Sequence, residues 1–143
     1  MTIDRGILAA RMATIRVELG RLRRLEHLAL DDFLASVVQQ HAAERELQIV
    51  IEACLDIGHH VISREGLRRP GDYRDVFTVL REAHVVDDAL GRRLEDMAGF
   101  RNRLVHGYLD VEPRRVFDIA RDELGDVEEF LAAVVRRYDL DRA

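Results

Sequence analysis

The sequence predicts an all-α protein, an antiparallel bundle of about five helices. Three observations support this class. Apolar residues recur at the helical spacing of three and four along most of the 143 residues. Alternating β-branched runs closed by Asn-Gly or Asp-Gly turns, which are typical of strands, do not occur. Two prolines and nine glycines interrupt the pattern, without repeats or low-complexity tracts, so residues 1–143 are expected to form a single helical domain.

The first two predicted helices cover residues 3–25 and 31–62. The second begins at Asp31 and Asp32, because acidic residues suit the N-terminus of a helix. Its buried side is expected to include the apolar residues Leu34, Val37 and Val38.

Three further helices are expected after a loop over residues 63–72, which is rich in charged and turn-forming residues. A short helix covers 73–84, a fourth covers 87–107, and a fifth covers 113–138 and begins with a proline. Gly125 is a position at which the fifth helix can be interrupted.

Charge and cysteine content limit the partners and the compartment. The net charge is -5 and every fixed positive charge is an arginine, so action on RNA requires a local cationic patch. The single cysteine, Cys54, excludes an internal disulfide and lies in an apolar run typical of a core. Neither a signal pattern nor an apolar stretch of the ~20 residues needed to span a bilayer is present, which predicts a cytoplasmic protein without membrane attachment.

One arginine breaks the apolar pattern of the fourth helix. The apolar stripe runs from Leu90 through Met97 to Leu104, and Arg101 occupies a place where a core residue is expected. A buried guanidinium requires a carboxylate partner, a subunit boundary or a phosphate ligand. A structural ion pair is the simplest interpretation, with Asp56 as a candidate partner.

The residues after Arg101 suggest phosphodiester chemistry. Asn102 and His106 share a helix face, whereas Arg101 and His106 are about 140° apart around an ideal helix. Gly107 can end the helix and so let the histidine turn toward the arginine. Arginine can bind a phosphate, histidine can transfer protons near neutral pH, and asparagine can orient the imidazole or contact the phosphate. Since the ribose 2′-hydroxyl is the nucleophile of such a cleavage, neither a metal nor a cofactor is expected.

The motif resembles that of HepT-type toxins in the HEPN superfamily. It consists of Arg101, four residues, His106, one residue and then Tyr108. Residues 51–62 resemble the family's second long helix, and residues 108–120 resemble the entry to its last helix. The similarity extends over roughly residues 5–135.

The resemblance implies a homodimer in which two copies of the motif face each other across a cleft and cleave RNA without a metal. Arg101 and His106 correspond to the catalytic pair, and Asn102 corresponds to the motif's polar position. The resemblance also implies a toxin–antitoxin system. In it, an antitoxin of the MNT nucleotidyltransferase type transfers AMP to Tyr108 and silences the ribonuclease.

Other charged residues allow two interpretations. Arg103 and the pair Arg114 and Arg115 are candidates for contacts with the RNA backbone, and a solvated face explains them equally well. Adjacent histidines, His59 and His60, point about 100° apart on a helix, which does not favour a shared metal ion.

Two alternatives to an RNA-cleaving toxin remain open at this point. One is a non-catalytic HEPN-like dimer that binds a nucleotide or a nucleotidyltransferase. The other is a helical scaffold in which Arg101 forms only an ion pair.

Overall fold

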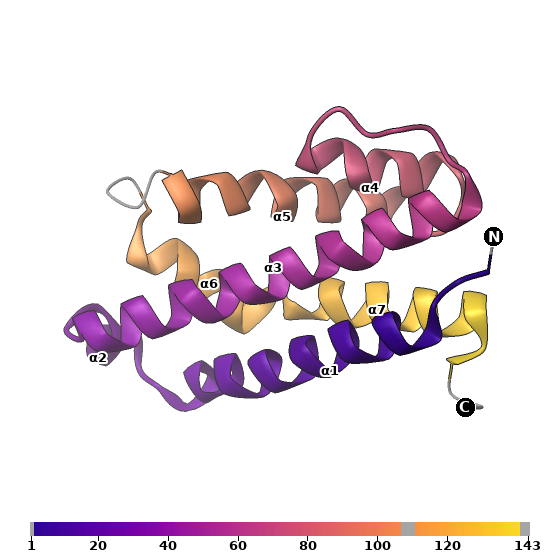
Figure 1. Ribbon diagram of the computed structural model, residues 1–143. Coiled ribbons are helices and arrows are strands. Elements are labelled where there is room, and N and C mark those ends of the chain that lie inside the picture. The colour runs from indigo at the N-terminus through magenta and orange to yellow at the C-terminus, as the bar shows by residue number, and fades with distance from the viewer. Residues whose placement is uncertain (1, 107–110, 141–143) are drawn as a thin grey trace.

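The protein is all-helical, as the sequence predicts. A computed structural model describes residues 2–106 and 111–140, and these form seven α-helices and one 3-10 helix. Four long helices alternate in direction along the bundle (Figure 1): α1 (Arg5–Leu22), α3 (Val37–Glu65), α5 (Asp88–His106) and α7 (Leu124–Tyr138). The N- and C-terminal ends of the described chain lie at the same end of the bundle.

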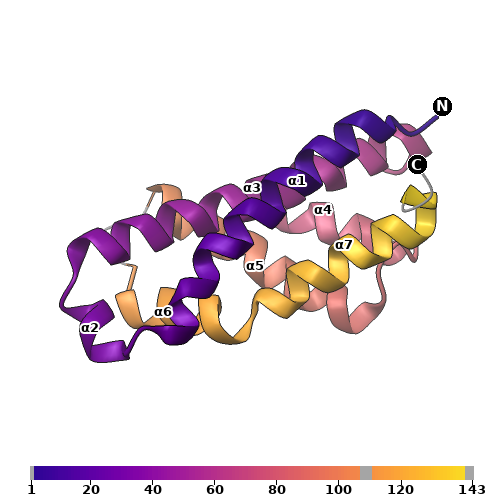
Figure 2. The same ribbon diagram turned by 90° about the horizontal axis from the view of Figure 1, so that it is seen from below.

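The shorter helices connect or cover these four. The 3-10 helix (Arg23–His27) continues α1, α2 (Leu30–Leu34) precedes α3, and α6 (Pro113–Asp122) precedes α7. Helix α4 (Tyr73–Glu82) packs against α3 and α5. It lies on the far side of α3 from α1, as the two views in Figures 1 and 2 show.

Two of the five predicted helices are each divided in two. The predicted helix over 31–62 breaks at Ser36, whose hydroxyl accepts a hydrogen bond from the amide of Gln39 at 3.2 Å and caps α3. The last predicted helix breaks at Glu123, two residues before Gly125. The break at Ser36 is hard to predict because apolar residues on both sides continue the helical spacing.

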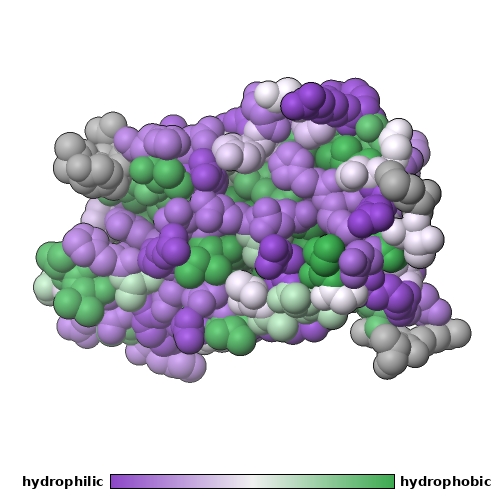
Figure 3. All heavy atoms as spheres, in the orientation of Figure 1, coloured by the Kyte–Doolittle hydropathy of each residue, from purple (hydrophilic) through white to green (hydrophobic). Residues whose placement is uncertain are grey.

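The same break corrects the predicted buried face of the second helix. Leu34, Val37 and Val38 are 43%, 61% and 78% exposed. Because α2 ends before α3 begins, a periodicity drawn across the break does not describe one continuous helix face. Apolar residues gather on the surface over the end of the molecule where α2 precedes α3 (Figure 3).

One apolar core joins the helices. Phe77 of α4 contacts Phe130 of α7 edge-on, with ring centroids 5.5 Å apart, and Phe33 contacts Phe117 at 5.2 Å. Cys54 is fully buried as predicted, and burial raises the pKa of its thiol. Within residues 2–106 and 111–140, the helices lack the combination of length and apolar character that crossing a membrane requires.

Candidate active site

Arg101 extends from α5 toward α3, where it meets a carboxylate. Its side chain is 15% exposed, and its Nε and Nη2 atoms donate to Oε1 of Glu52 at 3.3 and 3.0 Å. Gln48, one turn earlier on α3, donates to the same oxygen at 3.2 Å. The charge of the arginine is therefore balanced at a position where the stripe predicts a core residue. The predicted partner was wrong: Asp56, one turn later on α3, pairs with Arg11 at 3.3 Å.

Tyr73, the first residue of α4, supplies a second contact to Arg101. The Cζ atom of the guanidinium lies 4.5 Å from the centroid of the tyrosine ring, a cation–π distance. Arg101 is thus held by an acidic side chain of α3 and an aromatic ring of α4. Its Nη1 atom keeps no hydrogen-bond partner within residues 2–106 and 111–140. Among the described residues, this nitrogen of the guanidinium is therefore left for a ligand.

Hydrogen bonds from Arg68 hold the loop before α4 in place. Arg68 donates to both carboxylate oxygens of Asp75 at 2.7 Å and to Glu82 at 2.9 and 3.1 Å. The hydrogen bonds from Arg68, together with the one from the Gly71 amide, lower the pKa of the Asp75 carboxyl to about 2. Asp72 caps α4 by accepting from the Asp75 amide at 2.8 Å. Tyr73, the first residue of α4, therefore follows a loop that is held by hydrogen bonds.

Two adjoining cavities open beside Arg101. The smaller has a volume of about 240 Å³ and is lined by Glu52, Leu55, Asp56, His59, Tyr73 and Arg101. The larger has a volume of about 570 Å³ and is lined by His59, Pro70, Gly71, Asp72, Tyr73, Arg74 and Asn102. Because they share His59 and Tyr73, the two cavities form one polar groove, which we call the Arg101 groove.

Of the predicted catalytic residues, Arg101 and His106 lie on different sides of α5. Arg101 and Asn102 both line the Arg101 groove. His106 is exposed and is the last residue of α5, which is continuous from Arg101 onward. The five-residue separation between Arg101 and His106 therefore corresponds to about 140° around the helix. The predicted helix end at Gly107 and the predicted modification site Tyr108 lie outside the described residues.

The predicted RNA-contacting arginines lie near the start of α6. Arg103 and Arg115 line a cavity of about 210 Å³ between the end of α5 and α6. Arg115 donates to Glu123 at 2.6 Å, so part of its charge is neutralised. Arg114 is exposed in the first turn of α6. These side chains are on the surface, and their contact with RNA stays a prediction.

The two adjacent histidines have separate surroundings. Nε2 of His60 accepts a hydrogen bond from the Asp4 amide at 3.0 Å, which ties the start of α1 to α3. Burial, with a smaller contribution from Arg64, lowers the pKa of His60. His59 is exposed and faces the Arg101 groove. In the described part of the chain, three or more His, Cys, Asp or Glu side chains do not group in a way that could hold a metal ion.

Several groove residues were not predicted as site residues, among them Glu52, His59 and Tyr73. Each is distant from Arg101 in the sequence, and only the packing of α3 and α4 on α5 brings them together. One signal was available in the sequence, since an arginine on an apolar stripe requires an acidic partner from another helix.

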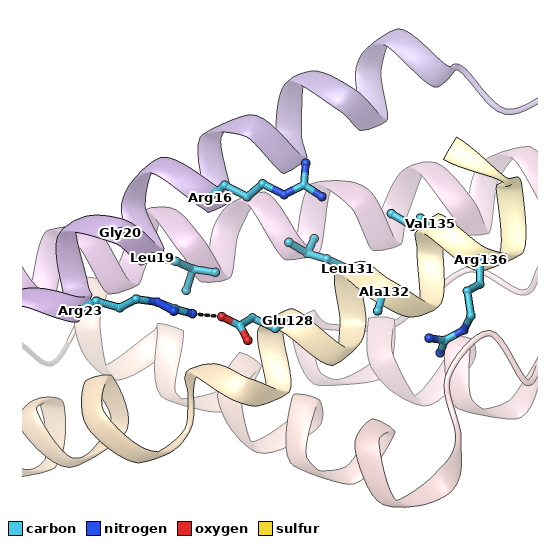
Figure 4. A pocket seen from close by; sticks show the side chains of 9 residues that line it. All are labelled: Arg16, Leu19, Gly20, Arg23, Glu128, Leu131, Ala132, Val135 and Arg136. Atoms are coloured by element: carbon cyan, nitrogen blue, oxygen red, sulfur yellow. Dashed lines mark ion pairs between the residues drawn. The ribbon is translucent and has the colours of Figure 1, made fainter. Parts of the chain in front are cut away.

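A larger cavity, of about 690 Å³, lies elsewhere, between α1 and α7 (Figure 4). Arg23 forms an ion pair with Glu128 across it, and its apolar side chains are those of Leu19, Leu131, Ala132 and Val135. It contains none of the predicted site residues, so cavity size does not identify the candidate site.

Comparison with known sequences places this geometry in context. Residues 15–134 match the model of a family described as ribonuclease HepT-like. A tRNA nuclease HepT from Aphanizomenon flos-aquae is 33% identical over 115 residues, which cover 80% of this chain and 78% of that protein. An mRNA nuclease HepT from Shewanella oneidensis is 28% identical over 130 residues, 90% of this chain and 96% of that protein.

A solved structure shows a similar fold. The tri-AMPylated HEPN toxin of Shewanella oneidensis, in complex with an MNT antitoxin, superposes with a TM-score of 0.84. It is 28% identical in sequence, and the match covers 91% of this chain and 97% of that one. The agreement over nearly the whole of both chains confirms the predicted HEPN-like fold.

Proposed function

The chain belongs to the HepT-like ribonuclease family, and from that membership we propose that it is the toxin of a HEPN/MNT toxin–antitoxin pair. It acts as a metal-independent endoribonuclease, with Arg101 and His106 as its catalytic residues. The structures and names of its relatives support this activity. The position of Arg101 is the observation that carries the proposal most directly: it lines a polar groove with its Nη1 atom unpaired within the described residues.

The proposed reaction is an intramolecular transesterification. The ribose 2′-oxygen attacks the adjacent phosphorus, the bond from phosphorus to the 5′-oxygen breaks, and the proton of the 2′-hydroxyl leaves to a base. The 5′-oxygen leaves with a proton, which gives a 2′,3′-cyclic phosphate and a 5′-hydroxyl end. The His106 imidazole suits one of these proton transfers. Arg101 stabilises the charge that develops on the phosphate, and Asn102 contacts the phosphate or orients the imidazole.

A second copy of the chain is part of the proposal. Because α5 is continuous through His106, Arg101 and His106 of one protomer point in directions about 140° apart. In a homodimer whose two α5 helices face each other, Arg101 of one protomer can act on the same phosphate as His106 of the other. Arg103, Arg114 and Arg115 are then candidates for contacts with the RNA backbone on either side.

The partner antitoxin is a nucleotidyltransferase of the MNT type. We propose that the oxygen of the Tyr108 hydroxyl attacks the α-phosphorus of ATP and that its proton leaves to a base. The bond between the α-phosphorus and the bridging oxygen breaks, and pyrophosphate leaves with its electron pair. The AMP group adds bulk and negative charge two residues from His106. Both effects oppose the binding of an RNA phosphate.

The alternative is a non-catalytic dimer in which Arg101 has a structural role. The Arg101–Glu52 ion pair favours this alternative, since it satisfies the arginine without a ligand. A cleavage assay separates the two. Purified protein is incubated with single-stranded RNA in excess chelator, and the products are analysed for cyclic phosphate ends.

Cleavage by the wild-type protein and loss of cleavage in both Arg101→Ala and His106→Ala would support the catalytic proposal. Arg92→Ala is the matched control, because Arg92 is an exposed arginine of the same helix outside the groove. Cleavage retained by both site variants, or lost in chelator, contradicts the proposed roles or the metal independence, respectively.

A further inference from the structure

We propose that the Arg101 groove contains a subsite for one unpaired RNA nucleotide next to the bond that is cleaved. Its base stacks on Tyr73, and its polar edges and phosphate meet His59, Asn102 and Arg74. The inference rests on the proposed function and adds a residue-level basis for its substrate specificity.

The aromatic surface comes from Tyr73. This large aromatic residue is 40% exposed. The Arg101 guanidinium lies over its ring at 4.5 Å from the centroid, and the residue lines both the smaller and the larger cavity. Unpaired bases stack on such rings, whereas bases in a duplex are already stacked and paired.

A cationic side chain also lines the larger cavity. Arg74 is the residue after Tyr73, and its guanidinium passes over Gly99 of α5, where any side chain would collide with it. Its ion pair with Asp96 is 3.4 Å long, and the two side chains are 56% and 83% exposed. A pair so exposed contributes little stability, so Arg74 can exchange the carboxylate for a phosphate.

The same cavity also offers hydrogen-bonding side chains. The amide of Asn102 supplies donors and an acceptor, and the imidazole of His59 supplies one of each when neutral. Both are exposed and line the larger cavity. His59 is available for this because its neighbour His60 is the one engaged in the bond to Asp4.

The volume of the larger cavity and its preformed wall both fit a nucleotide. The larger cavity measures about 570 Å³, within the range of roughly 300–1,000 Å³ of small-ligand sites. The hydrogen bonds of Arg68 to Asp75 and Glu82 fix the loop that forms one wall before any ligand binds. A wall ordered in advance reduces the entropy lost on binding.

The consequence is a requirement for an unpaired base beside the cleaved phosphate. Arg101 contacts both Glu52 and Tyr73, so a nucleotide whose base stacks on the ring lies beside the guanidinium that is proposed to bind the cleaved phosphate. RNA with that nucleotide in a duplex cannot occupy the subsite. Loops and single-stranded ends are therefore the expected substrates.

Binding measurements in a cleavage-deficient background test the subsite separately from catalysis. Short fluorescent single-stranded RNAs are titrated against His106→Ala protein by anisotropy, and an abasic ribose is placed at each position in turn. At one position the missing base is expected to weaken binding about tenfold, the lower part of the effect that base–aromatic stacking gives. Adding Tyr73→Leu should abolish that difference, while Tyr73→Phe should keep it.

Two further variants make the test independent of Tyr73, which also contacts Arg101. Asn102→Ala should weaken binding of the intact RNA more than it weakens binding of the RNA that is abasic at that position. Arg74→Gln should weaken binding of both RNAs, whereas Arg92→Gln, an exposed arginine of α5 outside the groove, should not.

Several outcomes overturn the subsite. An abasic penalty of the same size in Tyr73→Leu and in the parent shows that the base lies elsewhere. Competition by free AMP at the concentration at which the RNA binds shows a site for free nucleotides and not for RNA. Equal RNA cleavage by the wild-type protein and by Tyr73→Leu leaves the proposed function intact and contradicts the subsite. In contrast, base-dependent binding without any cleavage by the wild-type protein supports the subsite and contradicts the proposed function.

Discussion

The guanidinium of Arg101 and the carboxylate of Glu52 form an ion pair at 3.0 Å that joins α5 to α3 at the wall of a polar groove. One oxygen, Oε1, accepts from both Nε and Nη2 and is itself held by Gln48. The pair therefore balances the arginine's charge and fixes its direction while Nη1 keeps no partner among the described residues. We infer that Glu52 is a positioning residue for Arg101.

Replacing Glu52 tests this positioning role. Glu52→Ala should lower kcat for RNA cleavage about tenfold or more, since displacement of a catalytic group by a fraction of an ångström is costly. The free energy of unfolding should fall by about 1 kcal/mol, because the arginine loses a partly buried partner. Glu52→Gln keeps an oxygen acceptor and should recover most of kcat.

The matched control is Glu95→Ala. Glu95 forms a pair of the same 3.0 Å length with Arg81, between α4 and α5, outside the groove. It should lose a similar stability and keep its kcat. Equal kcat values for Glu52→Ala and Glu95→Ala would show that Glu52 is only structural.

Tyr108 is expected to be the acceptor of AMP. Co-expression with a cognate MNT-type nucleotidyltransferase should raise the intact mass of the chain by one or more AMP units. Tyr108→Phe should prevent the increase, because it removes the nucleophilic hydroxyl. An equal mass increase in Tyr138→Phe is expected, since that hydroxyl is hydrogen-bonded to Glu65. A modified Tyr108→Phe protein would place the AMP on another residue.

The close packing of α4 on α3 depends on Gly58. A Cβ atom added there would lie 2.6 Å from Cγ1 of Val76 and 3.4 Å from Cδ1 of Leu80. Gly58→Ala should therefore lower the free energy of unfolding by about 1–3 kcal/mol in urea titrations. Gly20→Ala, in α1 with no atom within 4 Å, should raise it by up to about 1 kcal/mol. A gain in stability for both variants would contradict the close contact.

The ordered loop before α4 should depend on pH through Asp75. Arg68 lowers the pKa of this carboxyl to about 2 in the folded protein, from an ordinary value of 3.8. A lowered pKa means that the unfolded chain binds the proton more readily, so the stabilisation is present above about pH 4 and is lost as pH falls toward 2.

Urea unfolding between neutral pH and pH 2.5 measures this contribution. Asp75→Asn should be less stable than the wild type at neutral pH and should approach it at the acidic end. Asp88→Asn, whose carboxylate is 77% exposed and 3.8 Å from Arg81, should follow the wild-type curve. A constant difference between Asp75→Asn and the wild type at all pH values would exclude the proposed titration.

The sequence predicts the helices well because each buries a stripe of apolar residues with its own local period. The prediction fails at Ser36, because its side chain caps a new helix within an apolar run and the helical spacing restarts there. It identifies Arg101 as exceptional for a physical reason, the cost of burying a charge. It names the wrong partner because Glu52 and Asp56 lie one turn apart on α3, and the rotation of α3 against α5 decides between them.

Heterodimers of two inactive variants test most directly whether Arg101 and His106 act together across a cleft between protomers. Arg101→Ala and His106→Ala chains with different tags are co-expressed, and the mixed dimer is purified on both tags. Each mixed dimer keeps one intact pair, Arg101 of one protomer with His106 of its partner, so it should cleave RNA at about half the wild-type rate. An inactive mixed dimer, alongside an active wild-type dimer prepared with the same tags, would contradict the composite site.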